Sequence, residues 1–154
     1  MVRSMGEFKL IAHRGNIAGP NPDNENKIDY LKNSYNIGYD IEVDLIGHRG
    51  ILYFGHDEPD EVADTNFIQQ PGIWCHAKNL QALELLTKMR VHYFWHQKDD
   101  ITITSRQYFW CYPGQWYRNN RSIWLDFENH KYPKDLSGIY GICSDHLTIY
   151  KNHI

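Results

Sequence analysis

Three acids alternate with apolar residues in the segment YDIEVDLI, residues 39–46. Asp40, Glu42 and Asp44 share one face if this segment is a strand, because successive side chains of a strand point to opposite sides. Carboxylates on a buried face destabilise the fold unless they are neutralised, and a divalent cation held by paired carboxylate oxygens neutralises them. The alternative is an exposed edge strand with one solvated face. The segment therefore predicts either a cation site or a solvated sheet edge.

Histidines and cationic side chains end other strand-like segments of the chain. They are His13 with Arg14, His56 with Asp57, and His76 with Lys78. The carboxyl ends of strands are where α/β folds place their ligands. A metal ion and cationic side chains neutralise phosphate charge, and histidines transfer protons near neutral pH, so the combination predicts metal-assisted phosphoryl chemistry. A single histidine at a strand end is more often a structural residue than a catalyst, so the hypothesis depends on the combination.

Eight short runs rich in β-branched and aromatic residues predict the strands that position these side chains. They cover residues 8–15, 39–46, 50–57, 73–78, 91–97, 108–114, 122–128 and 139–145. Two helices are predicted between them, one over 26–37 and one capped by Asn79. Alternating strands and helices indicate an α/β fold with a mostly parallel sheet, but the later gaps are too short for full helices. The second His-Arg-Gly, at 48–50, is predicted to be a hairpin turn with exposed side chains.

Composition narrows the class of protein. The 154 residues carry a net charge of −3 and are 42% hydrophobic, which predicts one globular domain over residues 1–154. No basic field for nucleic acid is present, and no apolar run is long enough for stable membrane insertion. Three cysteines in apolar or aromatic runs predict buried thiols in a reducing compartment, so a cytoplasmic location is expected. The aromatic side chains, 14% of the chain, either fill the core or face a second copy, which leaves a homo-oligomer open.

Six short motifs together resemble the glycerophosphodiester phosphodiesterase family, within the phospholipase-C-like phosphodiesterase barrels. They are AHRG (12–15), PDNEN (22–26), GYDIEVD (38–44), GHD (55–57), HAK (76–78) and GICSD (141–145). The family's barrel normally needs about 250 residues. For this shorter chain the resemblance implies a reduced TIM-type (β/α) barrel of seven or eight mostly parallel strands, with several helices shortened or missing.

The resemblance also implies roles for individual residues. His13 and His56 match the catalytic acid/base pair, and Arg14 and Lys78 match the groups that bind the phosphate. Glu42 and Asp44 match two carboxylate ligands of a divalent ion, usually Ca²⁺ or Mg²⁺. The expected activity is hydrolysis of a small-molecule phosphodiester, such as a glycerophosphodiester of lipid metabolism.

His76 stands where the family has its third metal carboxylate. Imidazole binds Mn²⁺ or Zn²⁺ better than Ca²⁺ or Mg²⁺. Either the ion differs, or the site has only two protein anions, or Asp126 or Glu128 supplies the third.

Two other functions fit the same motifs. In one, the enzyme is a lyase or phospholipase-D-like phosphodiesterase that forms a cyclic phosphate. In the other, the chain is a catalytically degenerate barrel that binds a phosphorylated ligand without turnover, as the substitution at His76 suggests.

Overall fold

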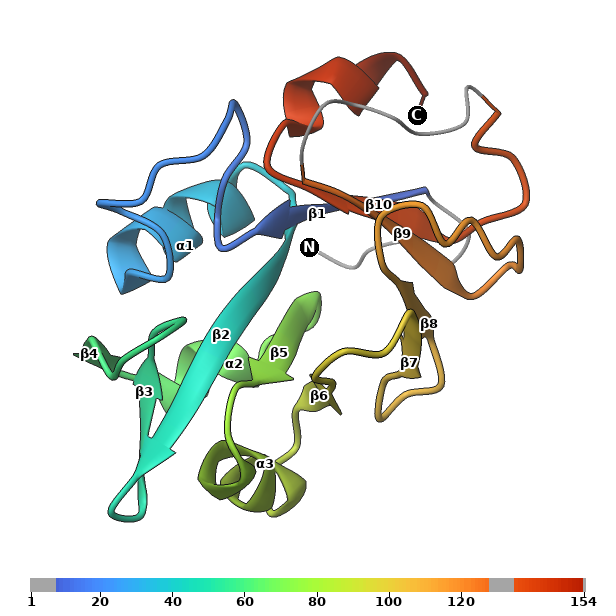
Figure 1. Cartoon of the computed structure of the whole chain (residues 1–154). Helices are drawn as coiled ribbons and strands as arrows, with labels where there is room; N and C mark the ends of the chain where they lie inside the picture. Colours follow the sequence, from blue (N-terminus) through green and yellow to red (C-terminus); the bar gives the residue numbers. More distant parts are fainter. Residues whose placement is uncertain (1–7, 128–134, 154) are drawn as a thin grey trace.

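The computed structural model describes residues 8–127 and 135–153, which form one curled ten-stranded sheet (Figure 1). The strands are β1 (Lys9–His13), β2 (Asp40–His48), β3 (Ile51–Phe54), β4 (Glu61–Val62), β5 (Ile73–Ala77), β6 (His92–Trp95), β7 (Ile101–Ile103), β8 (Phe109–Cys111), β9 (Ser122–Asp126) and β10 (Gly141–Ser144). Parallel pairs connect β6, β5, β2, β1, β10, β9 and β8 in that order. Antiparallel pairs add β3 and β4 beyond β2, and β7 beyond β8.

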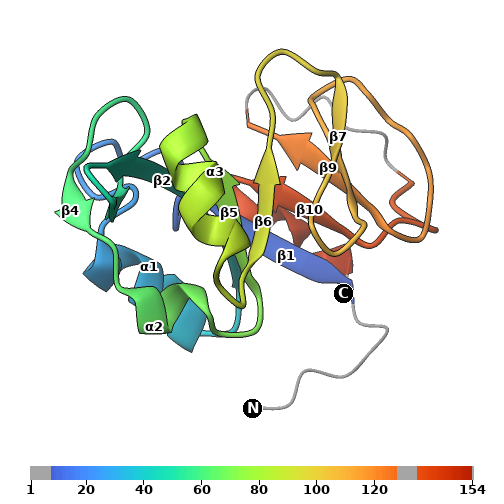
Figure 2. The same ribbon diagram turned by 90° about the horizontal axis from the view of Figure 1, so that it is seen from below.

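Three short α-helices cover part of the sheet in the described residues. They are α1 (Ile28–Asn36), α2 (Thr65–Ile68) and α3 (Leu80–Thr87), and a 3₁₀ helix η1 (Leu147–His153) contacts β1. Figure 2 shows all three α-helices gathered around β2 and β5, and within the described ranges no α-helix packs on the half formed by β7 to β10.

The expectation of a reduced TIM-type (β/α) barrel is therefore wrong. The fold is a curled, half-barrel sheet of mixed strand direction with few helices. The physical reason lies in the connections: β7 turns directly back onto β8 as an antiparallel hairpin, so a helical crossover is not needed there. Parallel strands require long crossovers, and the chain between β6 and β8 is too short to hold one.

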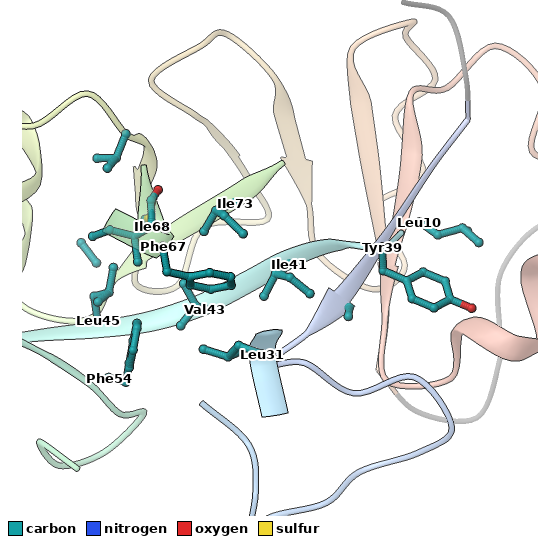
Figure 3. Close-up of a cluster of buried hydrophobic side chains, with 14 of the residues drawn as sticks. Leu10, Leu31, Tyr39, Ile41, Val43, Leu45, Phe54, Phe67, Ile68 and Ile73 are labelled. Carbon is teal, nitrogen blue, oxygen red and sulfur yellow. The ribbon is translucent and has the colours of Figure 1, made fainter. Parts of the chain in front are cut away.

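The outer face of the sheet packs against the helices. In Figure 3, Ile41 and Val43 of β2 lie with Leu31 of α1 and Phe67 of α2 in one cluster of buried apolar side chains. Burial of this face accounts for the apolar positions that alternate with the acids of β2, and each large buried side chain contributes roughly 1.5–3 kcal/mol to folding.

A second apolar cluster lies on the opposite, concave face. It consists of Ile11, Trp74, Phe94, Trp110, Ile123, Leu125 and Cys143. These residues come from strands at both ends of the curl, so their mutual contact shows that the sheet folds around them. All three cysteines are buried free thiols, as predicted.

Local sequence signals predicted several elements correctly. The side chain of Asn79 accepts a hydrogen bond from the Ala82 N–H and caps α3. Residues 48–50 form the turn between β2 and β3, where Arg49 and Gly50 have positive φ angles and are exposed. Within the described residues no helix is both long and apolar enough to cross a membrane.

Candidate metal centre

The acidic face of β2 lies inside the molecule. Asp40, Glu42 and Asp44 are all buried, and β2 is paired with β1, β3 and β5. The prediction of an interior strand is confirmed, and the alternative of a solvated edge is wrong. The acids point to the concave face, where the indole N–H of Trp74 donates to Asp40 at 3.0 Å.

Glu42, Asp44 and His76 form a buried group that could hold a metal ion. Each offers one ligand atom, and these atoms lie within 4.8 Å of one another. Nδ1 of His76 is 3.2 Å from Oδ1 of Asp44 because the two residues are register partners on β5 and β2. Among the described residues, Oε1 of Glu42 and Nε2 of His76 are buried and have no hydrogen-bond partner. Buried unpartnered donors and acceptors are costly, so these atoms fit the role of metal ligands.

The two acids of this group have opposite pKa shifts. Burial and the neighbouring Asp44 charge raise the pKa of Glu42 to about 8. Burial alone would also raise the pKa of Asp44, but the hydrogen bond and charge of His76 and the charge of Arg14 outweigh it and hold that pKa below its usual value. A bound cation would favour the charged form of both acids.

Asp44 is held from its other side by residues of the loop after β1. Nε of Arg14 is 3.0 Å from Oδ2 of Asp44, and the Asn26 side-chain amide donates to the same oxygen at 2.9 Å. The Asn26 carbonyl oxygen in turn accepts from the Asp44 backbone N–H at 3.0 Å. Arg14 and Asn26 have φ angles of 56° and 62°, a strained region for residues other than glycine. The contacts with Asp44 stabilise these strained backbone conformations and hold Arg14 next to the acids.

His13 lies at the end of β1, beside Glu42. Its Nε2 is 3.6 Å from Oε2 of Glu42, and its Nδ1 is 2.8 Å from Oδ1 of Asp145. The ring stacks on Phe127 with centroids 4.1 Å apart. Burial lowers the pKa of His13, but the charges of Glu42 and Asp145 and the hydrogen bond to Asp145 raise it above its ordinary value.

Lys78 follows β5 two residues after His76, so both side chains leave the same face of that segment. Its backbone N–H donates to the Leu45 carbonyl at 2.9 Å, which fixes Lys78 beside the strand that carries the acids, and its charge lowers the pKa of Glu42. The structure thus brings Lys78 to the same end of the sheet as His13 and Arg14.

His56 is placed differently from the other predicted site residues. It lies in the loop after β3, and the backbone N–H of the preceding Gly55 donates to the Asp44 carbonyl at 3.2 Å. Its ring contacts the Asp57 carboxylate at 2.8 Å, and its side chain is 38% exposed. Within the described ranges the ring makes no hydrogen bond or ion pair with the metal group or His13. Its pairing with His13 stays a prediction.

The two other acids proposed as a third ligand do not complete the group. Asp126 accepts a hydrogen bond from the hydroxyl of Tyr150. Tyr150 belongs to the cluster of apolar side chains between the sheet and the helices, so the Asp126 carboxylate lies on the outer face of the sheet. Glu128 lies outside the described residues. His76 is the third member of the group that the structure assembles.

Sequence analysis gave no role to two residues that the structure places at the site: Asp145 contacts His13, and Asn26 contacts Asp44. His96, for which the sequence favours a core or surface position over an extra site residue, stacks on His76 with centroids 5.0 Å apart. Asn26 and Asp145 lie within the PDNEN and GICSD motifs, and His96 follows the end of β6. Polar residues at strand ends were the available signal, but their contacts depend on pairing between distant strands.

No protein-family model, curated protein or solved structure matches the chain. The resemblance to the glycerophosphodiester phosphodiesterases therefore stands on the sequence motifs alone. What the chain does has to be argued from the geometry of this site.

Proposed function

We propose that the chain is a divalent-metal-dependent phosphodiesterase that hydrolyses glycerophosphodiesters or similar small phosphodiesters. The observation that supports this proposal is the position of His13 and Arg14 directly beside the buried Glu42, Asp44 and His76. In this proposal His13 is the proton-transfer group and Arg14 the phosphate-binding cation, and both lie next to the three residues that would hold the metal.

In this proposal Arg14 and Lys78, the cationic side chains near the acids, bind the phosphate. Arg14 contacts Asp44 through Nε and donates from Nη1 to Glu25 at 3.4 Å, so Nη2 is the nitrogen that would bind an incoming anion. Lys78 adds a second positive charge from β5. The bound ion would withdraw charge from the phosphate and make phosphorus more open to attack.

His13 would transfer a proton at Nε2. Asp145 contacts Nδ1 and favours the tautomer that carries its hydrogen there, so Nε2 faces Glu42 with its lone pair free. Asp145 also accepts from the Asn16 amide at 2.8 Å, which fixes the carboxylate itself. Asp145 is thus a positioning residue that acts through His13.

The second proton-transfer group in this proposal is His56. One histidine takes a proton from the attacking water or neighbouring hydroxyl, and the other gives a proton to the leaving alcohol. The hydrogen bond from the Gly55 backbone N–H to the Asp44 carbonyl holds the loop that carries His56 next to the strand of the acids.

The exposed ring of His56 favours a second candidate, a site that binds a phosphorylated ligand without turnover. A chain with one positioned histidine would bind the anion but lack the second proton transfer. The two candidates share all the phosphate-binding residues and differ in whether product forms.

The test is hydrolysis of a panel of glycerophosphodiesters and bis(p-nitrophenyl) phosphate with Mg²⁺, Ca²⁺, Mn²⁺ or Zn²⁺. We expect His13→Ala and His56→Ala each to abolish turnover while the circular dichroism spectrum stays unchanged. His48→Ala is the matched control, because His48 also precedes an arginine but is exposed in the hairpin turn.

Each result separates the candidates. Full activity in both histidine variants would exclude the two-histidine mechanism. Calorimetric binding of glycerol phosphate without turnover under any of the four ions would support the binding-only candidate. Phosphorus NMR of the product distinguishes a monoester, the expected product, from the cyclic phosphate of a lyase or phospholipase-D-like enzyme.

A further inference from the structure

We propose that His76 makes this site selective for Zn²⁺ over Mg²⁺ and Ca²⁺. The inference rests on the metal site of the proposed function and adds which class of ion that site takes. Three features of the site carry it: the fixed orientation of the His76 ring, the small number of free carboxylate oxygens, and the nature of the donor atoms.

The ring of His76 is held by two neighbouring rings and at one edge. It stacks on Phe94 of β6, with centroids 4.7 Å apart and planes at 17°, and on His96, which follows β6, at 5.0 Å and 23°. Asp44 holds its Nδ1 edge at 3.2 Å. A ring fixed in this way loses little conformational freedom when it binds an ion, so it acts as a preorganised nitrogen ligand.

The carboxylates offer few free oxygens. Oδ2 of Asp44 is occupied by the Asn26 amide and by Arg14, which leaves Oδ1 as the available ligand. Glu42 offers Oε1, which is buried without a partner, while its Oε2 lies 3.6 Å from His13. Ca²⁺ takes about six to eight oxygen ligands, often from bidentate carboxylates, and bidentate binding by Asp44 would require both Asn26 and Arg14 to leave.

Two single oxygens and one imidazole match a different class of ion. Catalytic Zn²⁺ sites have three protein ligands of nitrogen and oxygen type and keep another position open for water or substrate. One ligand atom from each of the three residues lies within 4.8 Å of the others, and Nε2 of His76 is buried without a hydrogen-bond partner. Mg²⁺ prefers oxygen ligands, and an imidazole in place of a carboxylate lowers its affinity.

The experiment is calorimetric titration of the metal-free 154-residue chain with Zn²⁺, Mg²⁺ and Ca²⁺ separately. We expect one Zn²⁺ per chain, bound roughly 10²-fold or more tighter than Mg²⁺ or Ca²⁺. His76→Glu restores a carboxylate at the same position, so the ratio of Zn²⁺ to Mg²⁺ affinity is expected to fall at least about tenfold. His48→Glu makes the same change at an exposed turn and should leave the ratio unchanged.

Equal affinity of the native chain for Zn²⁺ and Mg²⁺, or an unchanged ratio in His76→Glu, would overturn the inference. Nitrogen-15 NMR of the native chain gives a test that does not depend on how the variant folds. We expect Zn²⁺, and not Mg²⁺, to shift a ring-nitrogen signal of His76, and absence of that shift would also overturn it. Mg²⁺ bound as tightly as Zn²⁺, together with hydrolysis supported by Mg²⁺, would refute this selectivity and leave the proposed function standing. Tight Zn²⁺ binding without hydrolysis under any ion would support the selectivity and refute the proposed function.

Discussion

Glutamine in place of Glu42 tests how the buried acid controls the stability of the metal-free protein. Burial, together with the nearby Asp44 charge, raises the pKa of Glu42 from 4.5 to about 8. The folded state therefore binds this proton more tightly than the unfolded chain. Its contribution to the free energy of unfolding is fully present below the unfolded pKa of 4.5 and is lost as pH rises through about 8.

The size of the effect follows from proton linkage. Between the two pKa values, the contribution falls by about 1.4 kcal/mol per pH unit, which amounts to about 3–4 kcal/mol between pH 5 and pH 8. Glutamine has nearly the same shape and stays neutral, so it removes this dependence. The quantity to compare is the unfolding free energy of the native chain minus that of Glu42→Gln at each pH.

Taking this difference cancels the contributions of the buried histidines. Burial lowers the pKa of His92 to about 3 and that of His96 to about 4, and the pKa of His76 is lowered too. These groups make the protein more stable as pH rises towards 6.5, which is the opposite slope to that of Glu42. These three groups are present in both proteins, so the remaining slope reports on Glu42 together with His13, whose pKa the Glu42 charge raises.

The assay is urea unfolding in the presence of a chelator, followed by tryptophan fluorescence at pH 5, 6, 7 and 8. Glu84→Gln is the matched control, because Glu84 lies on α3 with a 73% exposed side chain and should give no slope. A difference between native chain and Glu42→Gln that stays flat across this range would refute the raised pKa. A slope of the same size in the control would refute its assignment to Glu42.

Three further substitutions test the surroundings of the site and the packing of the sheet. Asp145→Asn should lower kcat roughly 10- to 100-fold with little change in KM, and lower the pKa of His13 by NMR; an unchanged pKa would contradict its positioning role. Asn26→Ala removes two buried hydrogen bonds at a φ of 62° and should cost about 2–4 kcal/mol in urea unfolding, so a loss within error would contradict this account. Gly47→Ala would place a Cβ 2.5 Å from a backbone nitrogen of α3 and should cost at least about 3 kcal/mol, whereas Gly50→Ala, in open space, should cost about 1 kcal/mol. Equal losses in the two glycine variants would contradict the close approach of α3.

Local patterns in the sequence were enough to predict much of the secondary structure. The alternating acids of β2, the Asn79 cap of α3 and the turn at 48–50 each depend on residues close together in the chain. Their conformations follow from side-chain alternation, capping and positive φ angles, which are local properties. The same patterns missed β4, β7 and α2, which are too short to show a period.

The sheet as a whole could not be predicted in this way. Motif resemblance favoured a reduced barrel with seven or eight mostly parallel strands, but β4 and β7 add antiparallel pairs that change the topology. Whether a short segment crosses over or turns back depends on the strands already in place, and this is a property of the assembled sheet.

The sequence by itself determined which residue types are available at this site: two acids on one face of a strand, and histidines and cations at strand ends. Only the tertiary structure decided how they meet. Asp44 faces His76 because β2 and β5 pair in a fixed register, and His13 meets Asp145 because β1 lies beside β10. It also left His56 exposed and added His96 to the site. Contacts between residues far apart in the chain are set by strand order and register, which a one-residue slip would change completely.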